Sequence, residues 1–278
     1  MGDRKERHVY QTYGYWDFVS EMSNTPPNPE GMYASDPGSL TSASKSWDLG
    51  AGWEGAVEMG VTGYPKASKA IAQVRAATRQ LLDLGAPSYE WDVTGMSPDI
   101  PEFLSGNPEN MMGWSDEEAR PVLRIGIAGC YHAGNNAKYA TNMGGAVLTL
   151  LDAMEAAGYA VELVSCFRLS GGYDPRLTAA CNVVVKSSEE YVDVDRMAYA
   201  ICHPAFFRRL FFRWIELLDA KDQSTLGWGY GTPNAISDDE ADDWDILIPA
   251  PDRSTSGTKE VALETVIAAA GDLIEVEV

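Results

Sequence analysis

Hydrophobic residues follow two different periods in the middle of the chain. Residues 122–128 are nearly all apolar, which is typical of a buried strand. Over residues 143–157 the apolar positions recur at helical spacing, and Gly158 then suits the left-handed end of a helix. Residues 160–167 are again apolar. Two buried strands joined by a helix predict a right-handed parallel βαβ unit.

The alternation of strands and helices continues to the end of the chain. The further elements that the pattern predicts are strands at 182–186, 246–249 and 273–278 and helices at 193–202, 205–218 and 258–270. This order is typical of an α/β fold, in which helices cover a sheet of parallel strands. We therefore expect residues 119–278 to form a three-layer, Rossmann-like domain with a mostly parallel sheet, preceded by an irregular and helical N-terminal region at 1–118.

The first 118 residues differ in composition, because they are rich in aromatic residues, Pro and Gly. One long helix is predicted at 66–84, where the apolar residues share a face, and shorter helices are predicted at 15–22 and just before Gly60. The aromatic residues clustered near the N-terminus are expected to pack against another surface, in this chain or in a partner. Residues 89–118 combine Pro, Gly and Asn and predict an irregular loop.

Charge narrows the range of partners. The 278 residues carry a formal net charge of −20, with a pI near 4.4. Binding to a nucleic-acid backbone requires a surplus of Lys and Arg, so a nucleic-acid-associated role is disfavoured. The same charge would repel anionic lipid. With 45% hydrophobic residues the chain can still fill a sizeable core.

Targeting signals are absent from the pattern. The first residues lack the apolar segment of a signal peptide, and no apolar run reaches the ~18 residues that a membrane span needs. The cysteines form no CxxC pair, as expected of free thiols inside a cell. We therefore expect a protein that is neither secreted through a signal peptide nor embedded in a membrane.

The loop after the first strand of the βαβ unit lies where open α/β sheets bind their ligands. Gly129 and Gly134 have the spacing of the two glycines of a phosphate-binding loop. Asn135 and Asn136, however, stand where that loop has Lys and Ser or Thr. Because the cation and the magnesium-binding hydroxyl are missing, nucleotide binding is not favoured, and we predict no cofactor.

Cys130 and His132 in the same loop suggest two other kinds of site. They could act as a nucleophile and its base, or they could join Cys166 and His203 as metal ligands. No pair among them has the usual spacing of zinc ligands, so we predict no metal site. The acidic run at 238–245 lacks the glycine and terminal Glu of a calcium loop and is interpreted as a solvated loop. Catalysis by Cys130 and His132 stays open as an alternative.

The helix predicted at 205–218 is both aromatic and basic. It is either a core helix whose Arg side chains extend across apolar surface, or an interface, because Phe, Trp and Arg are enriched at binding hot spots. Its arginines would suit an acidic partner or an acidic patch on a second copy, which allows for a homo-oligomer. The candidate interface residues are Phe206, Phe207, Arg208, Arg209, Phe211, Phe212, Arg213 and Trp214.

Several segments resemble a family of uncharacterised proteins that tailed phages and prophages encode. The similar stretches are, in order, DVTGMSPDIPEFLSGNPENMM, GYAVEL and HPAFFRRLFF, and the resemblance covers residues 45–220. It implies a viral source, with the host cytoplasm or the virion as the location. It implies no catalytic mechanism.

The second half of the chain is also similar in layout to a von Willebrand factor A-like domain, which has an apolar strand, a loop, a helix ending here in AAGY, and a second strand. In that fold the first loop carries the metal-binding sequence DxSxS. Residues 126–132, GIAGCYH, contain neither the Asp nor the Ser pair. The resemblance therefore implies a scaffold for protein contacts in which the metal site is missing.

These observations lead us to expect a non-enzymatic, phage-encoded protein that binds other protein subunits, of the phage or its host. It would act in virion assembly or as a virion component. Two alternatives stay open, namely an enzyme whose site is the loop at 129–136 and a nucleic-acid-associated accessory protein.

Overall fold

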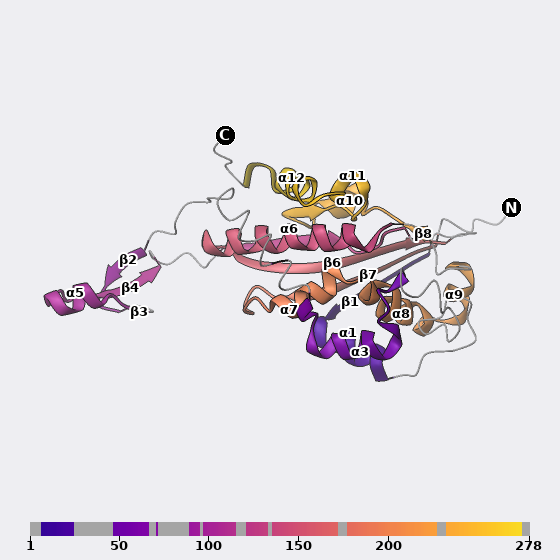
Figure 1. The fold of residues 1–278 in the computed structure, drawn as a ribbon, viewed down its shortest axis with the longest axis horizontal. Coiled ribbons are helices and arrows are strands. Elements are labelled where there is room, and N and C mark those ends of the chain that lie inside the picture. Colours follow the sequence, from indigo (N-terminus) through magenta and orange to yellow (C-terminus); the bar gives the residue numbers. More distant parts are fainter. Residues whose placement is uncertain are drawn as a thin grey trace.

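The computed structural model describes residues 7–24, 47–66, 71, 89–94, 97–114, 121–132, 135–171, 177–226 and 232–273. Its main body is built on one mixed sheet with helices, and a smaller sheet with one helix projects from that body (Figure 1). The α/β class expected from the sequence is confirmed.

The predicted βαβ unit lies at the centre of the main sheet. Strand β5 (Val122–Ala128) leads through helix α6 (Ala137–Ala156) to strand β6 (Ala160–Ser170), and the two strands are parallel with Leu123 opposite Val161. The helix begins earlier than predicted, because Asn136 caps it by accepting a hydrogen bond from the Lys138 amide.

The main sheet has the strand order β1-β7-β6-β5-β9, and β8 also pairs with β6. The additional strands are β1 (Arg7–Gly14), β7 (Leu177–Lys186), β8 (Thr232–Pro233) and β9 (Ile246–Ile248). Along the main path, β1 with β7, β5 with β6 and β5 with β9 are parallel, whereas β6 with β7 is antiparallel. The expectation of a mostly parallel sheet is thus confirmed.

The N-terminal residues belong to the same sheet and core as the C-terminal half. Strand β1 pairs with β7, and helix α1 (Tyr15–Asn24) buries Phe18 in the main hydrophobic core. The helix predicted at 15–22 is confirmed. The described residues on either side of residue 118 therefore do not separate into the two structural units that composition suggested, because a strand with few apolar residues is recruited through its backbone.

Helix α3 (Gly52–Thr62) corrects the prediction of a helix that ends before Gly60. The helix runs through Gly60 and ends at Gly63, whose φ of 75° is left-handed. Gly60 instead allows close packing, since a Cβ there would meet Val19 at 2.8 Å. The Tyr15 hydroxyl donates to the Gly60 carbonyl at 2.9 Å. Of the long helix predicted at 66–84, all but residues 66 and 71 lie outside the described part.

The remaining helical elements are, in chain order, α7 (Val194–Met197), η1 (Ala198–Cys202), η2 (Phe206–Phe211), α8 (Phe212–Leu217), α9 (Ala220–Leu226), α10 (Asp238–Ala241), α11 (Arg253–Ser256), α12 (Lys259–Ala270) and η3 (Gly271–Leu273). The helices predicted at 193–202, 205–218 and 258–270 are present, whereas α9, α10 and α11 were not predicted, and α10 begins the acidic run that was interpreted as a loop. Elements η1 and η2 are π-helical, with wider turns than an α-helix. The strand predicted at 273–278 lies outside the described residues except for Leu273, which ends η3.

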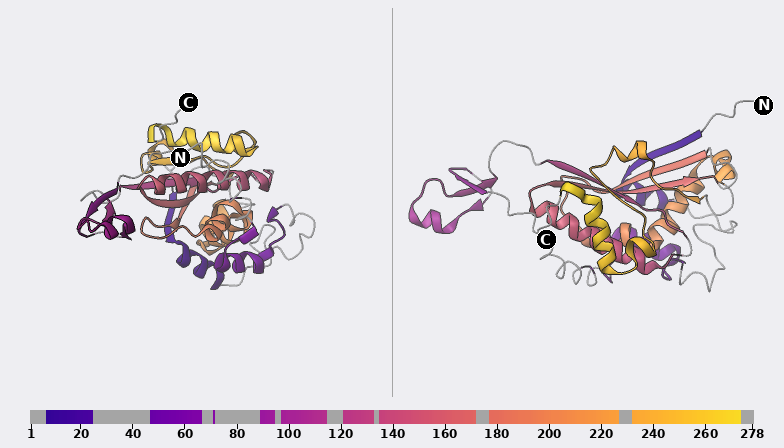
Figure 2. Two further views of the ribbon diagram at one scale, coloured as in Figure 1. Left: turned by 60° about the vertical axis from the view of Figure 1, so that its left-hand side comes forward. Right: turned by 90° about the horizontal axis from the view of Figure 1, so that it is seen from above.

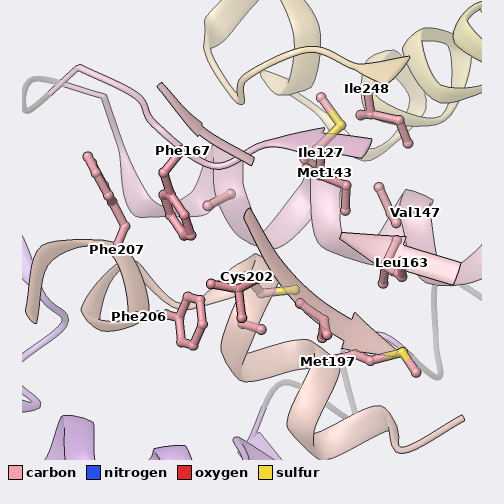
Figure 3. Close-up of a cluster of buried hydrophobic side chains, with 14 of the residues drawn as sticks. Ile127, Met143, Val147, Leu163, Phe167, Met197, Cys202, Phe206, Phe207 and Ile248 are labelled. Carbon is pink, nitrogen blue, oxygen red and sulfur yellow. The ribbon is translucent and has the colours of Figure 1, made fainter. Parts of the chain in front are cut away.

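The larger described helices cover one face of the sheet. Helices α1, α3, α6 and α12 and elements η1 and η2 all contribute to one hydrophobic core with the odd-numbered residues of β5 and β6, such as Ile127 and Phe167 (Figure 3). Seen from above, these helices lie on one side of the strands (Figure 2). The main body therefore has two principal layers where three were expected.

The second face of the sheet is covered by residues 234–244, which include α10. Trp244 packs so closely over Gly126 that a Cβ at Gly126 would lie 2.7 Å from the indole ring. The Arg168 guanidinium on this face pairs with Glu240 at 3.1 Å. Trp244 packs there with Val164 and Cys166 in a second, smaller hydrophobic cluster.

The region predicted as an irregular loop at 89–118 contains a small folded element. Strands β2 (Tyr89–Asp92), β3 (Ser97–Pro98) and β4 (Met111–Trp114) form an antiparallel sheet in the order β2-β4-β3, and helix α5 (Ile100–Ser105) follows β3. We call residues 89–114 the arm, because they extend away from the main body (Figures 1 and 2).

No helix among the described residues is both long and apolar enough to cross a membrane.

Close contact between α6 and η1 gives a test of this packing. A Cβ at Gly144 would overlap the Cys202 Sγ atom and come within 3.4 Å of Ile201. We expect Gly144→Ala to lower the free energy of unfolding by about 1–3 kcal/mol, the usual cost of overpacking, as measured by urea denaturation.

The matched control is Gly55→Ala in helix α3, where a Cβ would lie 3.6 Å from the Ala51 Cβ atom. That change should be neutral or stabilise by about 0.5–1 kcal/mol, since Ala is the better helix former. Combining Gly144→Ala with Cys202→Ala should recover part of the loss. Equal effects of the two glycine substitutions would contradict the packing described.

Candidate functional site

A cleft of about 430 Å³ opens at the carboxyl ends of β5 and β9. The chain reverses its direction across the sheet at β5, because α6 leads to β6 on one side whereas β9 pairs on the other. Open α/β sheets bind ligands at such points. The cleft is lined by the residues that follow β5, β8 and β9, including Tyr131, Asn234 and Pro251.

Cys130 contributes to the wall of this cleft but is only 3% exposed. Burial raises the pKa of its thiol far above the usual value, and the nearby Arg168 offsets only part of that rise. Since the thiolate is the reactive form of cysteine, Cys130 is not an activated nucleophile. The three other cysteines are also buried and free.

His132, the second residue of the predicted pair, is exposed. Its backbone carbonyl accepts hydrogen bonds from the Asn135 amide at 3.0 Å and from the Arg208 guanidinium at 3.4 Å. The exposed imidazole and the buried thiol of Cys130 do not form an activated nucleophile and base.

Asn135 and Asn136 stand where a phosphate loop has Lys and Ser or Thr, and their side chains form hydrogen bonds with the backbone of this chain. The Asn135 amide donates to the Pro251 carbonyl at 3.0 Å and thereby ties the loop after β5 to the loop after β9. Asn136 caps α6. Both side chains thus make bonds within the chain in place of phosphate contacts.

The four residues considered as metal ligands are not brought together. Cys166 lies with Trp244 on the second face of the sheet, whereas Cys130 lies in the main core on the opposite face. His203 is buried against Tyr64, with ring centroids 4.5 Å apart. Within the described ranges, no three His, Cys, Asp or Glu side chains are grouped closely enough to hold a metal ion.

The aromatic and basic helix is part of the core and does not form an outward surface. All eight candidate interface residues are buried within the chain, namely Phe206, Phe207, Arg208, Arg209, Phe211, Phe212, Arg213 and Trp214. Phe167 of β6 stacks on Phe211 with ring centroids 4.2 Å apart. Phe167 also stacks on Phe207, with ring centroids 5.9 Å apart (Figure 3). The core interpretation is therefore right for these residues, and their proposed role as an interface is corrected.

Arg209 makes a buried ion pair with Asp48. The Arg209 guanidinium donates to Asp48 Oδ2 through two nitrogens, at 2.6 and 2.8 Å. The amides of Gly50 and Gly52 also donate to the Asp48 carboxylate, at 2.9 and 3.0 Å. Hydrogen bonds between charged groups are stronger than those between neutral groups. Here they fix residues 48–52 against η2.

Arg208 connects the same segment to the cleft. Its guanidinium lies over the Trp47 ring at 4.4 Å and over the Tyr131 ring at 5.1 Å. It also donates to the carbonyls of Trp47 at 2.5 Å and His132 at 3.4 Å. The arginines of this helix thus bind segments of this chain, which explains their concentration in an acidic protein without an acidic partner.

The arm is the candidate site that sequence reasoning missed. Its helix α5 begins at Asp99, whose carboxylate accepts from the Glu102 amide at 3.2 Å, and ends at Gly106, whose φ is 81°. In the sequence, Asp99 followed by Pro101 is typical of the start of a helix, and Gly106 is typical of its end. The density of Pro and Gly around it favoured a loop instead.

The ion pair between Asp48 and Arg209 can be tested by Asp48→Asn. The neutral side chain keeps its hydrogen-bond acceptor but removes the charge opposite a buried guanidinium, so the free energy of unfolding should fall by about 3 kcal/mol in urea denaturation. Glu54→Gln, at an exposed position of α3, should change it by less than about 0.5 kcal/mol. A loss of stability no larger than that control would refute the assigned role.

The buried imidazole of His203 predicts how the stability of the fold depends on pH. Burial lowers the pKa of its imidazole from 6.5 to about 4. Between these two pH values the unfolded chain binds a proton that the folded chain does not, so stability should fall as the pH drops from about 6.5 to 4.

His203→Asn should remove this contribution, which amounts to up to about 3 kcal/mol, while still accepting the hydrogen bond from the Ala205 amide. Urea denaturation of this variant and wild type at pH 7 and pH 4.5 measures the difference. His132→Asn, a change at an exposed ring, is the matched control. An unchanged pH dependence in His203→Asn would show that the buried imidazole does not have this effect.

No curated protein and no solved structure matches the chain. A protein-family model described as "Domain of unknown function (DUF7192)" matches residues 5–271 and so spans both β1 and α12. Because this match covers nearly the whole chain, the protein belongs to the DUF7192 family.

Proposed function

We propose that the protein is a non-enzymatic interaction protein that binds a partner protein through its arm. The observation that supports this most strongly is the exposure of large apolar side chains on a projecting element. On α5, Ile100 is 57% exposed, Phe103 60% and Leu104 77%. Exposed apolar groups that are contiguous mark interaction surfaces in soluble proteins.

The spacing of these side chains places them on one side of α5. Residues at positions i, i+3 and i+4 of a helix share a face, which is the relationship of Ile100 to Phe103 and Leu104. Trp91 and Val93, at the end of β2, are also exposed, at 48% and 62%. None of the residues of α5 is buried.

The hydrogen bonds of the arm favour binding without large rearrangement. Asp99 accepts from the Trp91 indole at 3.1 Å as well as capping α5, and its own amide donates to the Asn110 carbonyl at 2.8 Å. These bonds connect β2, α5 and the start of β4. A surface held in place before binding loses less conformational entropy when a partner docks.

Charge indicates the chemistry of the partner. Residues 89–114 contain five acidic residues and no Lys or Arg. A complementary surface would combine an apolar groove with basic residues. Because the whole chain carries a net charge of −20, a different protein fits this description better than a second copy.

The proposed biological role of this interaction rests on the resemblances found in the sequence. The similarity of residues 45–220 to phage-encoded proteins supports a role in virion assembly, in the host cytoplasm or in the particle. The similarity to von Willebrand factor A-like domains supports a scaffold role for the main body. The buried, unactivated thiol of Cys130 gives the enzyme alternative no support.

The proposal is tested by cross-linking with a carbodiimide, which joins carboxylates to lysines. In cells that naturally express the protein, mass spectrometry should find cross-links from Glu109 and other arm carboxylates to lysines of one recurrent partner. Phe103→Glu combined with Leu104→Glu should abolish them, because charges replace the apolar contact. The fold should be retained, with a change in stability within about 0.5 kcal/mol, since both residues are exposed.

Val61→Glu is the matched control, because Val61 is 64% exposed on α3, outside the arm. It should leave the cross-links intact. The proposal would be contradicted if the protein were a strict monomer in light scattering and no partner were cross-linked at the arm. Cross-links that persist in the Phe103→Glu, Leu104→Glu variant would also contradict it.

A further inference from the structure

The cleft at the carboxyl ends of β5 and β9 has no role in the proposed interaction through the arm. Its volume of about 430 Å³ is in the range of small-molecule sites. Its walls come from three loops that are distant in sequence. The bond from the Asn135 amide to the Pro251 carbonyl fixes two of these loops relative to each other, so the cleft is largely formed in advance.

The walls of the cleft are mainly apolar and stiff. Pro233, Pro249 and Pro251 line it together with Leu247 and Ile248 of β9 and with Tyr131. Proline rings have no side-chain rotamers to lose, so they provide flat surfaces at low entropic cost. Walls of this kind suit a flat ligand better than a flexible one.

Two carboxamide side chains and one imidazole offer hydrogen-bonding groups at the cleft. Asn135 uses its amide nitrogen for Pro251, which leaves its Oδ1 atom as an acceptor. Asn234, whose backbone amide donates to the Arg168 carbonyl at 2.9 Å, places a second carboxamide at the cleft. His132 adds an exposed imidazole.

Charge argues against an anionic ligand. None of the lining residues that the structure describes is Lys or Arg. Asp252 at the cleft is a carboxylate whose pKa is lowered by hydrogen bonds from Ser254 and Thr255, so it is negative at neutral pH. A phosphate or carboxylate placed here would face this charge with no Lys or Arg among the described lining residues to bind it directly.

We propose that this cleft binds an uncharged, planar heterocycle with hydrogen-bond donor and acceptor groups on its edge, of the nucleobase or nucleoside class. The flat ring lies between the proline and aliphatic walls. The edge of the ring donates to Asn135 and accepts from Asn234, as side-chain amides do when they recognise bases.

Isothermal titration calorimetry of the full chain with adenosine, guanosine, cytidine and uridine tests this proposal. At least one nucleoside should bind with a Kd of about 1 mM or tighter. Its 5′-monophosphate should bind more weakly, because Asp252 repels the phosphate. No binding by any of the four, or tighter binding of the monophosphate, would overturn the proposal.

Two variants locate the binding. Asn135→Ala should weaken it about tenfold by removing one hydrogen-bonding partner, whereas Asn24→Ala, at an exposed amide of α1, should have no effect. Asn135→Ala also removes the hydrogen bond between the two loops, so a second variant is needed as an independent test.

That variant is Ala235→Trp. Ala235 is exposed at the cleft, so the indole should fill the cleft and abolish binding without disturbing the core. Binding that survives Ala235→Trp would place the ligand elsewhere and refute the assignment.

Discussion

The burial of charged side chains beneath an aromatic core is the constraint on which the main body depends. Arg209 lies deep in the layer of helices, where an ion without a counter-charge would be very costly. Asp48 supplies that charge from a segment 161 residues away in sequence. The two glycine amides on the same carboxylate fix the backbone around Asp48. This contact joins the N-terminal third of the chain to η2, and β1 and α1 complete the same core.

Local patterns in the sequence were enough to predict the centre of the fold. Residues 122–167 contain both signals that define a βαβ unit, and the structure follows them closely. Strand β1 could not be predicted in the same way, because RHVYQTYG contains few apolar residues and its partner is far along the chain. The number of layers was also beyond prediction. Residues 122–128 are mostly apolar on both faces of the strand, so the sequence does not show how each face is covered. In the structure Trp244 covers Gly126 on one face, whereas helices cover Ile127 on the other.

The position of the candidate site followed from the sequence more readily than its chemistry. A loop at the carboxyl end of β5 is a natural ligand site from the order of elements alone. Which of its side chains face solvent depends on contacts from β8, β9 and η2, which are distant in sequence. Cys130 and His132 are two residues apart, yet one is buried and the other is exposed. Residues 206–217 similarly have the composition of an interface, and only their contacts, such as that of Phe211 with Phe167 of β6, identify them as core.

The pairing of β1 with β7 also affects how the protein folds as it is made. Residues that touch across these strands, such as His8 and Thr178, are 170 positions apart. At about 5–20 residues per second, a ribosome takes roughly 10–30 s to deliver β7 after β1 has emerged. During that time the first strand has no native edge to join and remains available to other chains. Because β1 contains few apolar residues, it exposes less apolar surface during this interval than a more hydrophobic strand would.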